Sequence, residues 1–466
     1  MSESVLFPST KTRLMIDHAL TDLLAASRDR VNAGSVVPSF DAATFRNQLR
    51  RFDFENPLPI DQTLAWTVAQ METGLVHVAH PRYFGLFNPT PTFPAQCADR
   101  IAATFNPQLA TSTTSPAAVE IEAHVIQAIA RRTGLPPEAG GHFTTGGAEA
   151  NYTALLLALT RACPDFGSKG TRAFRGQPTF YVSRDSHLAW IKIAHQAGIG
   201  RSAVRLIATD GSGAMDARAL SAAIQEDRES GHEPVMVVAT AGTTNAGIID
   251  PLHACADLTD QTGIWFHVDA AWGGALVASD KYRLMLSGIE RADSITIDAH
   301  KWFAVTMGCG MFITRWRSLL FDAFHVATGY MPSSNHDDPY TNSMQWSRRF
   351  LGLRLFLSLA VAGWSGYAEH VERTIALANE LARKVAMLGE WRVLNSHTGV
   401  ICLEPPSHYH QDVRTIVKRV VASGKAWISV AEFEGRDVIR SCLTSGETTR
   451  DDVTELVHCL VSCCDH

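Results

Sequence analysis

Two polar side chains end two apolar, β-favouring segments in the second half of the chain. Asp269 follows the run Ile264–Val268, and Lys301 follows residues 294–300. A lysine amine can form a Schiff base with an aldehyde, and a carboxylate can keep a pyridine nitrogen protonated. Pyridoxal 5′-phosphate requires both of a protein, so the pair predicts this cofactor. Taken singly, each residue also fits a simpler interpretation, a surface lysine and an aspartate in a loop.

A pair of glycines precedes a predicted apolar helix. Residues 145–151 read Thr-Gly-Gly-Ala-Glu-Ala-Asn. Adjacent glycines leave backbone N–H groups free to face an anion, and the helix N-terminus adds the positive end of its dipole. We therefore expect Gly146 and Gly147 to hold a phosphate. The segment is not a P-loop because no Gly-Lys-Ser/Thr follows it, and a glycine turn without a ligand is the simpler alternative.

Two further polar segments follow predicted strands. Thr244 lies in the stretch Thr240–Gly247, where a hydroxyl suits a polar substituent of the cofactor, and Asp250 is expected to order this loop. His187 follows another strand, and its imidazole could stack on a flat ring. A small-residue loop and a satisfied loop histidine remain open as alternatives.

Bulk composition indicates a globular protein without a nucleic-acid partner. The 466 residues are 46% apolar and 19% charged, and 41 basic against 47 acidic residues give a net charge of −6 without a basic block. The histidines are scattered, so we expect no metal site. The N-terminus lacks the pattern of a secretory signal, and no apolar stretch is long enough to span a membrane. An odd count of nine cysteines without CxxC pairs predicts reduced thiols in a cytoplasmic protein.

The chain divides into three predicted parts. Residues 1–83 form a helical arm, residues 84–358 a large domain, and residues 359–466 a small α+β domain. In the large domain, strand-like runs alternate with helical patterns, which predicts an α/β fold with a mostly parallel sheet covered by helices. Ligands bind at the carboxyl ends of strands in such sheets, where Asp269 and Lys301 both lie.

Read together, these motifs resemble the group II pyridoxal-phosphate-dependent amino-acid decarboxylases. This family of fold type I includes aromatic-L-amino-acid, glutamate and cysteine-sulfinate decarboxylases. The resemblance begins at the His-Pro-Arg-Tyr-Phe run of residues 80–84, continues through Ser115-Pro116, and ends at residues 439–444, so it covers nearly the whole chain.

The resemblance implies a cofactor role for several residues. Lys301 would hold the cofactor as a Schiff base and Asp269 would pair with the pyridine nitrogen. Ala271 would face the ring opposite His187, and Thr244 would lie near the 3-hydroxyl group. Gly147, Ala148 and His300 would hold the phosphate.

The resemblance also implies two residues that act on the substrate. Tyr330 matches the loop tyrosine that protonates the quinonoid carbanion after CO2 leaves, and Arg440 matches an arginine that pairs with a substrate carboxylate. Two positions depart from the family pattern. Ala148 stands where relatives often have Ser or Thr, and Asp298 stands where aromatic decarboxylases have Asn. An ionised aspartate cannot donate to phosphate, so we expect Asp298 to bond the backbone or a neighbouring residue.

The predicted activity is decarboxylation of an L-α-amino acid to the amine and CO2. Tyr330 and His187 are both present, which favours simple decarboxylation over an aldehyde synthase. An aminotransferase on the same fold is another alternative, as is a non-enzymatic cofactor-binding protein.

The substrate is predicted from the segment after the His-Pro-Arg-Tyr-Phe run. Leu86 and Phe87 favour an aromatic side chain, and Asn88 would tolerate a polar group. An acidic substrate is the alternative, with Arg82 or Arg348 binding its side-chain carboxylate, although salt bridges explain these arginines more simply.

The resemblance finally implies a homodimer, in which the N-terminal arm clasps a second subunit and the active site lies at the interface. An extended arm could not bury its apolar residues alone.

Overall fold

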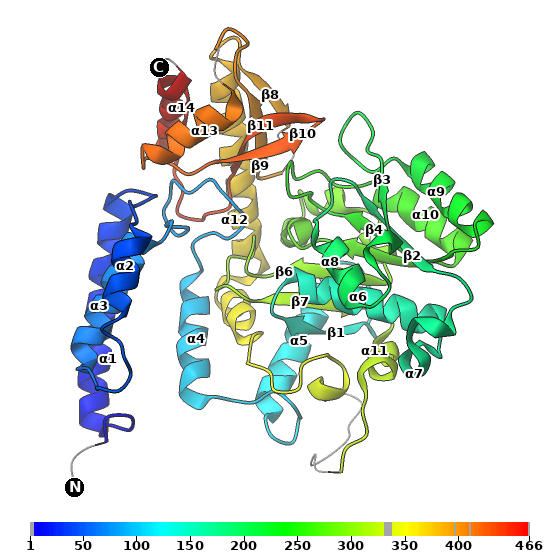
Figure 1. The fold of residues 1–466 in the computed structure, drawn as a ribbon, viewed down its shortest axis with the longest axis horizontal. Coiled ribbons are helices and arrows are strands. Elements are labelled where there is room, and N and C mark those ends of the chain that lie inside the picture. The colour runs from blue at the N-terminus through cyan, green and yellow to red at the C-terminus, as the bar shows by residue number, and fades with distance from the viewer. Residues whose placement is uncertain (1–3, 330–337, 396–397, 410–411, 465–466) are drawn as a thin grey trace.

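A computed structural model describes residues 4–329, 338–395, 398–409 and 412–464. Figure 1 shows a large sheet flanked by helices, a small sheet above it, and three arm helices standing to one side. None of the described helices combines the length and the apolar character needed to cross a lipid bilayer.

The large sheet has the strand order β1-β7-β6-β5-β4-β2-β3. Neighbouring strands from β6 to β3 run parallel, whereas β7 is antiparallel to both β1 and β6. The predicted α/β class with a mostly parallel sheet is confirmed. The strands are β1 (Gly140–Thr144), β2 (Pro178–Ser183), β3 (Val204–Ile207), β4 (Glu233–Thr240), β5 (Trp265–Asp269), β6 (Ser294–Asp298) and β7 (Gly310–Thr314).

Helices bury both faces of this sheet, which explains its nearly unbroken apolar strands. On β4, Val237 and Ala239 point into one core while Met236 and Val238 point into another, because side chains alternate along a strand. The first core is covered by α5 (Pro116–Arg132), α9 (Ala217–Glu229), α10 (Leu252–Thr262) and α12 (Leu353–Ala386). The second is covered by α6 (Gly147–Ala162), α8 (Ala189–Gln196) and α11 (Arg317–Phe324), with the short α7 (Phe166–Lys169) beside them.

A small antiparallel sheet forms a separate core near the C-terminus. Its order is β10-β11-β9-β8, and it packs against α12, α13 and α14. The elements are β8 (Arg392–Asn395), β9 (Val400–Glu404), α13 (Val413–Ala422), β10 (Ser429–Phe433), β11 (Arg436–Cys442) and α14 (Arg450–Cys464). Helix α12 runs across the predicted domain boundary at residues 358–359 and contains a non-helical Gly363. The boundary between the large and the small domain stays a prediction.

The arm consists of α1 (Thr10–Ala33), α2 (Ala42–Leu49) and α3 (Ile60–Gly74), and α4 (Phe93–Phe105) lies between it and the large sheet (Figure 1). Arg28 forms an ion pair with Glu447, and Arg100 of α4 forms one with Asp17 at 3.0 Å. Short 3₁₀ helices complete the described helical elements, at Gly170–Ala173, Arg201–Ala203, Gly273–Ala278, Arg283–Leu286, Ile289–Arg291 and Pro339–Thr341.

Candidate active site

The carboxyl ends of β4, β5 and β6 converge on one cavity. Thr240 pairs with Asp269 across β4 and β5, and Asp298 ends the next strand. The cavity has a volume of about 120 Å³. A buried water needs roughly 10–15 Å³ by this measure, so the cavity has room for more than a single water.

Most of the predicted site residues lie around this cavity. Phe87, Gly147, Ala148, His187, Thr244, Asp269, Ala271 and Lys301 line it. Asn151, Thr240, Gly242, Trp272 and Asp298, for which no site role was predicted, line it too. Gly146, His300, Leu86, Asn88 and Arg440 are not among its lining residues. Tyr330 lies outside the described residues.

The Asp269 carboxylate is buried and held at both oxygens. Its Oδ2 accepts a hydrogen bond of 2.8 Å from Asn151 Nδ2, and its Oδ1 accepts one of 3.1 Å from the Ala271 backbone N–H. The residue is only 5% exposed. N–H donors stabilise an ionised carboxylate, so this arrangement suits a partner that carries a proton, such as a pyridinium nitrogen.

Lys301 reaches into the same cavity and is mostly buried. Its Nζ lies 3.1 Å from Asp298 Oδ2 and 5.4 Å from the centre of the Phe87 ring. The interpretation of Lys301 as a surface lysine is therefore wrong. Asp298 bonds a neighbouring residue, as its chemistry led us to expect, and within the described part of the chain its Oδ1 has no hydrogen-bond partner.

The glycine pair opens α6 beside these residues. Gly146 is the N-cap of α6, and no side chain caps the helix N-terminus. A Cβ atom on Gly147 would lie 2.9 Å from Asp298 Oδ2, so only glycine fits without a shift of that carboxylate. His300 lies next to Gly146, and its Nδ1 is 3.0 Å from the carbonyl oxygen of Cys309. An uncapped helix N-terminus beside a histidine is a chemically suitable phosphate site.

His187 stands at the cavity mouth, where part of its ring reaches solvent in the single chain. Its Nδ1 accepts a hydrogen bond of 3.1 Å from the Ala189 backbone N–H, which leaves Nε2 to carry the proton of the neutral ring. Burial lowers the pKa of His187 below its ordinary value of 6.5, an effect that the charge of Lys301 reinforces and that of Asp269 opposes.

Arg440 is buried behind the cavity and joins two of the segments around it. Its Nε donates to the Thr244 carbonyl oxygen at 2.9 Å and its Nη1 to the Gly85 carbonyl oxygen at 2.7 Å. Its Nη2 is buried and has no hydrogen-bond partner among the described residues, and its Cζ lies 4.8 Å from the Phe87 ring centre. Arg440 therefore clamps the site and retains a nitrogen that can donate further.

An aromatic column forms one wall of the cavity. Phe87 stacks on Trp272 at 4.3 Å between ring centres, and Trp272 stacks on Trp302 at 4.4 Å. Trp302 Nε1 donates to Thr374 Oγ1 at 2.9 Å, which anchors the column on α12. No role was predicted for Trp272, although an aromatic residue directly after the small pair that follows Asp269 was an available signal.

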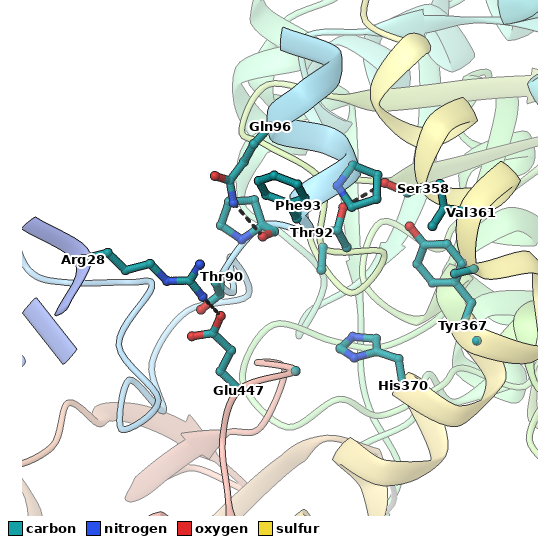
Figure 2. Close-up of a pocket in the computed structure, with 16 residues that line it drawn as sticks. Arg28, Thr90, Thr92, Phe93, Gln96, Ser358, Val361, Tyr367, His370 and Glu447 are labelled. Atoms are coloured by element: carbon teal, nitrogen blue, oxygen red, sulfur yellow. Dashed lines mark hydrogen bonds and ion pairs between the residues drawn. The ribbon is translucent and has the colours of Figure 1, made fainter. Parts of the chain in front are cut away.

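Two hydrogen bonds from side chains of α12 hold the segment that follows Lys301. Tyr367 donates to the Phe303 carbonyl oxygen at 3.1 Å, and His370 Nε2 lies 3.1 Å from the Trp302 carbonyl oxygen. Burial lowers the pKa of His370 to about 4, so the neutral ring donates through Nε2. Figure 2 shows Tyr367 and His370 projecting from α12 into a second cavity, of about 360 Å³. These bonds fix the backbone that carries Lys301.

Two buried acids lie outside the cavity. Asp250 accepts hydrogen bonds from the backbone N–H groups of Thr240, at 2.7 Å, and Met215, at 2.8 Å, so its predicted role in ordering the loop is confirmed. Glu122 pairs with Arg348 at 2.7 Å, and both line a different cavity. Arg348 is therefore a salt-bridge residue, and its alternative role as the partner of an acidic substrate is wrong.

The residues around the cavity fit pyridoxal phosphate. An amine, a buried carboxylate with both oxygens held by N–H donors, and an uncapped helix N-terminus surround a space of suitable size. Within the described residues, no group of three or more His, Cys, Asp or Glu side chains is arranged to hold a metal ion.

Comparison with known proteins gives the same chemistry. Residues 53–404 match the model of the pyridoxal-dependent decarboxylase conserved domain. The chain is 27% identical over 470 residues to an aromatic-L-amino-acid decarboxylase of Bacillus atrophaeus, covering 98% of this chain and 96% of the relative. It is 29% identical over 406 residues to an acidic amino acid decarboxylase of Bos taurus, covering 82% of this chain and 77% of the relative.

A solved structure has the same fold. The crystal structure of Oryza sativa TDC with PLP and tryptamine superposes with a TM-score of 0.92 at 25% identity, covering 98% of each chain. The chain therefore belongs to the pyridoxal-dependent decarboxylase family and is a pyridoxal-phosphate-dependent amino-acid decarboxylase.

Proposed function

We propose that this decarboxylase acts on an aromatic L-α-amino acid. The observation that carries the proposal is the buried Phe87 ring, which lines the cavity within 5.4 Å of Lys301 Nζ and is backed by Trp272. A flat apolar wall beside the reacting amine favours an aromatic side chain through offset stacking. The Bacillus atrophaeus relative, named for aromatic amino acids, supports this proposal.

The roles of the cavity residues follow from their positions. Bound pyridoxal phosphate supplies an electron sink for the bond that releases CO2. We assign Lys301 to carry the cofactor and Asp269 to hold the proton of its ring nitrogen. The N–H groups at Gly147 and Ala148, together with His300, would hold its phosphate. His187 covers the cavity mouth and excludes water from one side.

His187 and Lys301 are the described groups that can move protons. The Lys301 amine lies within the cavity, and neutral His187 presents Nε2–H at the mouth. The lowered pKa of His187 keeps its ring neutral near pH 7, with Nε2–H available as a hydrogen-bond donor. Tyr330, the proton donor that the family resemblance implies, remains a prediction.

Arg440 is assigned to the α-carboxylate of the substrate. A buried guanidinium with a free Nη2 can take one more acceptor, and a carboxylate is the strongest available. This role does not select a substrate, because every amino acid has an α-carboxylate. The polar Asn88 and the exposed Leu86 remain proposed contacts at the outer end of the pocket.

An acidic substrate is the second candidate. It is favoured by the Bos taurus relative, which is named for acidic amino acids. It is disfavoured by the ion pair that occupies Arg348.

A substrate panel separates the candidates. Purified protein loaded with pyridoxal phosphate is assayed for CO2 release from phenylalanine, tyrosine, tryptophan, aspartate, glutamate and cysteine sulfinate. We expect kcat/KM to be at least about tenfold higher for the best aromatic substrate, a difference of about 1.4 kcal/mol. A higher value for an acidic substrate would reverse the proposal. Hydrogen peroxide with an aldehyde, or a keto acid, as main product would instead indicate an aldehyde synthase or an aminotransferase.

We also propose a homodimer with the active site near the subunit interface. Helix α1 has no buried residue in the single chain, and Leu14, Met15 and Leu24 are each more than half exposed. A second copy that covers this arm, proposed as residues 1–83, would remove these side chains from water. Light scattering on the holoenzyme should give twice the mass of one chain, and a monomer mass would contradict this.

A reducing compartment is proposed from the cysteines. All nine are among the described residues and all are free thiols. Free cysteines are typical of cytoplasmic proteins.

A further inference from the structure

A buried hydrogen-bond chain ends on Asp269, and we refer to it as the Asp269 chain. It runs from Trp265 through Ser294, His267 and Asn151 to the Asp269 carboxylate. All five residues are at most 5% exposed. Three of them occupy alternate positions of β5 and therefore point to the same face of the sheet, toward α6.

The hydrogen bonds at the Trp265 end of the Asp269 chain can point in only one direction. The indole N–H of Trp265 can only donate, and it lies 2.9 Å from Ser294 Oγ. The serine oxygen accepts this bond, which leaves its own O–H for His267 Nδ1 at 2.8 Å.

The hydrogen bonds at the Asp269 end point in the same direction. Asp269 Oδ2 is an acceptor when ionised, so the atom of Asn151 that faces it at 2.8 Å is the NH₂ group. Asn151 Oδ1 must then accept, and its partner at 3.1 Å is His267 Nε2, which therefore carries the ring proton. His267 is neutral in this arrangement, which agrees with its burial, because burial lowers its pKa to about 4.

We propose that Trp265, Ser294, His267 and Asn151 are positioning residues that hold the Asp269 carboxylate ionised and aimed at the cofactor's ring nitrogen. The proposal rests on the function assigned to Asp269 above. Every hydrogen in the chain points toward the carboxylate, so each donor polarises the next and strengthens the last bond.

Loss of the Ser294 hydroxyl should act at a distance. Without that donor, His267 Nδ1 becomes a buried acceptor with no side-chain partner, and the indole N–H of Trp265 loses its acceptor. The hydroxyl then no longer polarises the His267 ring, so the bonds that run from Nε2 through Asn151 to Asp269 weaken.

The test uses three single variants of the full chain. Ser294→Ala removes the hydroxyl, and Ser294→Thr restores it. Thr314→Val is the matched control, because Thr314 pairs with Ser294 across β6 and β7, is equally buried, and donates to the Asp293 carbonyl oxygen outside the chain. The readouts are the dissociation constant for pyridoxal 5′-phosphate and the ¹⁵N chemical shift of the labelled pyridine nitrogen in the bound cofactor.

We expect Ser294→Ala to weaken cofactor binding about tenfold, equivalent to about 1.4 kcal/mol. Its ¹⁵N resonance should move toward that of an unprotonated pyridine. Ser294→Thr and Thr314→Val should both stay close to wild type. A Ser294→Ala protein with wild-type affinity and shift overturns the proposal, as does an equal change in Thr314→Val.

Two additional variants keep the test decisive. Asn151→Leu removes the last donor of the Asp269 chain and keeps a similar side-chain volume, so it serves as the test if Ser294→Ala does not fold. It should move the ¹⁵N resonance in the same direction, and an unchanged shift overturns the proposal. Asp269→Asn tests the function on which the chain rests. If the ¹⁵N shift changes in Asp269→Asn but not in Ser294→Ala, only the role proposed for the Asp269 chain is refuted. If the shift changes in neither variant, the role of Asp269 is refuted.

Discussion

Replacement of Asp269 by Asn should weaken both cofactor binding and the fold, through two separate losses. The substitution keeps the shape of the side chain but converts one carboxylate oxygen into an NH₂ donor. The wild-type carboxylate accepts from Asn151 at 2.8 Å and from the Ala271 backbone at 3.1 Å. With its oxygen toward Asn151, the new amide would direct its NH₂ group at the Ala271 N–H.

The two costs belong to different equilibria. A buried donor without an acceptor costs about 1–3 kcal/mol, and this penalty appears in the stability of the apoprotein. The bond to the cofactor's ring nitrogen loses its charged acceptor, worth about 1.5–3 kcal/mol. At 1.4 kcal/mol per decade, that second loss raises the dissociation constant roughly 10- to 140-fold.

Equilibrium dialysis of pyridoxal phosphate and urea unfolding of the apoprotein measure the two terms separately. Asp293→Asn is the matched control. Asp293 is a half-buried aspartate next to β6, and it accepts from Phe266 N at 2.8 Å and Trp316 Nε1 at 2.6 Å, at the other end of that strand. It should lose stability without losing affinity. A dissociation constant for Asp269→Asn within about threefold of wild type, below 0.7 kcal/mol, would refute this reasoning.

Three other predictions follow from the same structure. Phe87→Leu should lower kcat/KM for aromatic amino acids by up to about tenfold through lost stacking, while leaving values for acidic amino acids unchanged in the same assay. Glu122→Gln should lower the free energy of unfolding in urea by about 3–5 kcal/mol, because it leaves the buried Arg348 charge without its partner. The control Glu120→Gln, at an exposed position, should cost almost nothing. Equal losses in the two variants would argue against the ion pair. Burial raises the pKa of Asp250 from 3.8 to about 7, so the folded chain holds a proton that the unfolded chain releases, and stability falls as pH rises through this window. Asp250→Asn should flatten that slope in melting curves recorded from pH 4 to 7, and an unchanged slope would contradict the assignment.

Local patterns in the sequence predicted the strands of the large sheet and the residues at their ends. The β-favouring patterns of Ser294–Ile297 and Gly310–Thr314 predict two strands, which agree with β6 and β7 to within one residue. The position of Asp216 at the start of a helical pattern predicts an N-cap, and Asp216 is the N-cap of α9. Asp269 and Lys301 could be found because their chemistry follows from residue type and strand position alone.

Contacts between distant segments could not be predicted in this way. The Arg440 clamp joins Gly85 and Thr244, and no local pattern links these three positions. The stack of Phe87 on Trp272 depends on the same long-range packing.

The prediction of secondary structure in the small domain was also incomplete. Strands β8 and β10 were not predicted, because their residues are mostly half-buried and lack a continuous apolar run. The sequence pattern predicts a core helix around Leu355 to Trp364 and a separate helical stretch from Tyr367 to Leu388, whereas α12 joins the two across the non-helical Gly363.

The position of the cofactor on the chain tests the central claim most directly. Holoenzyme treated with borohydride, digested and examined by mass spectrometry should carry the pyridoxyl group on the peptide that contains Lys301. Lys301→Ala protein treated in the same way should carry none and should release no CO2 from any amino acid of the panel. A pyridoxyl group on a different lysine of the wild-type chain, or CO2 release at the wild-type rate by Lys301→Ala, would contradict the account.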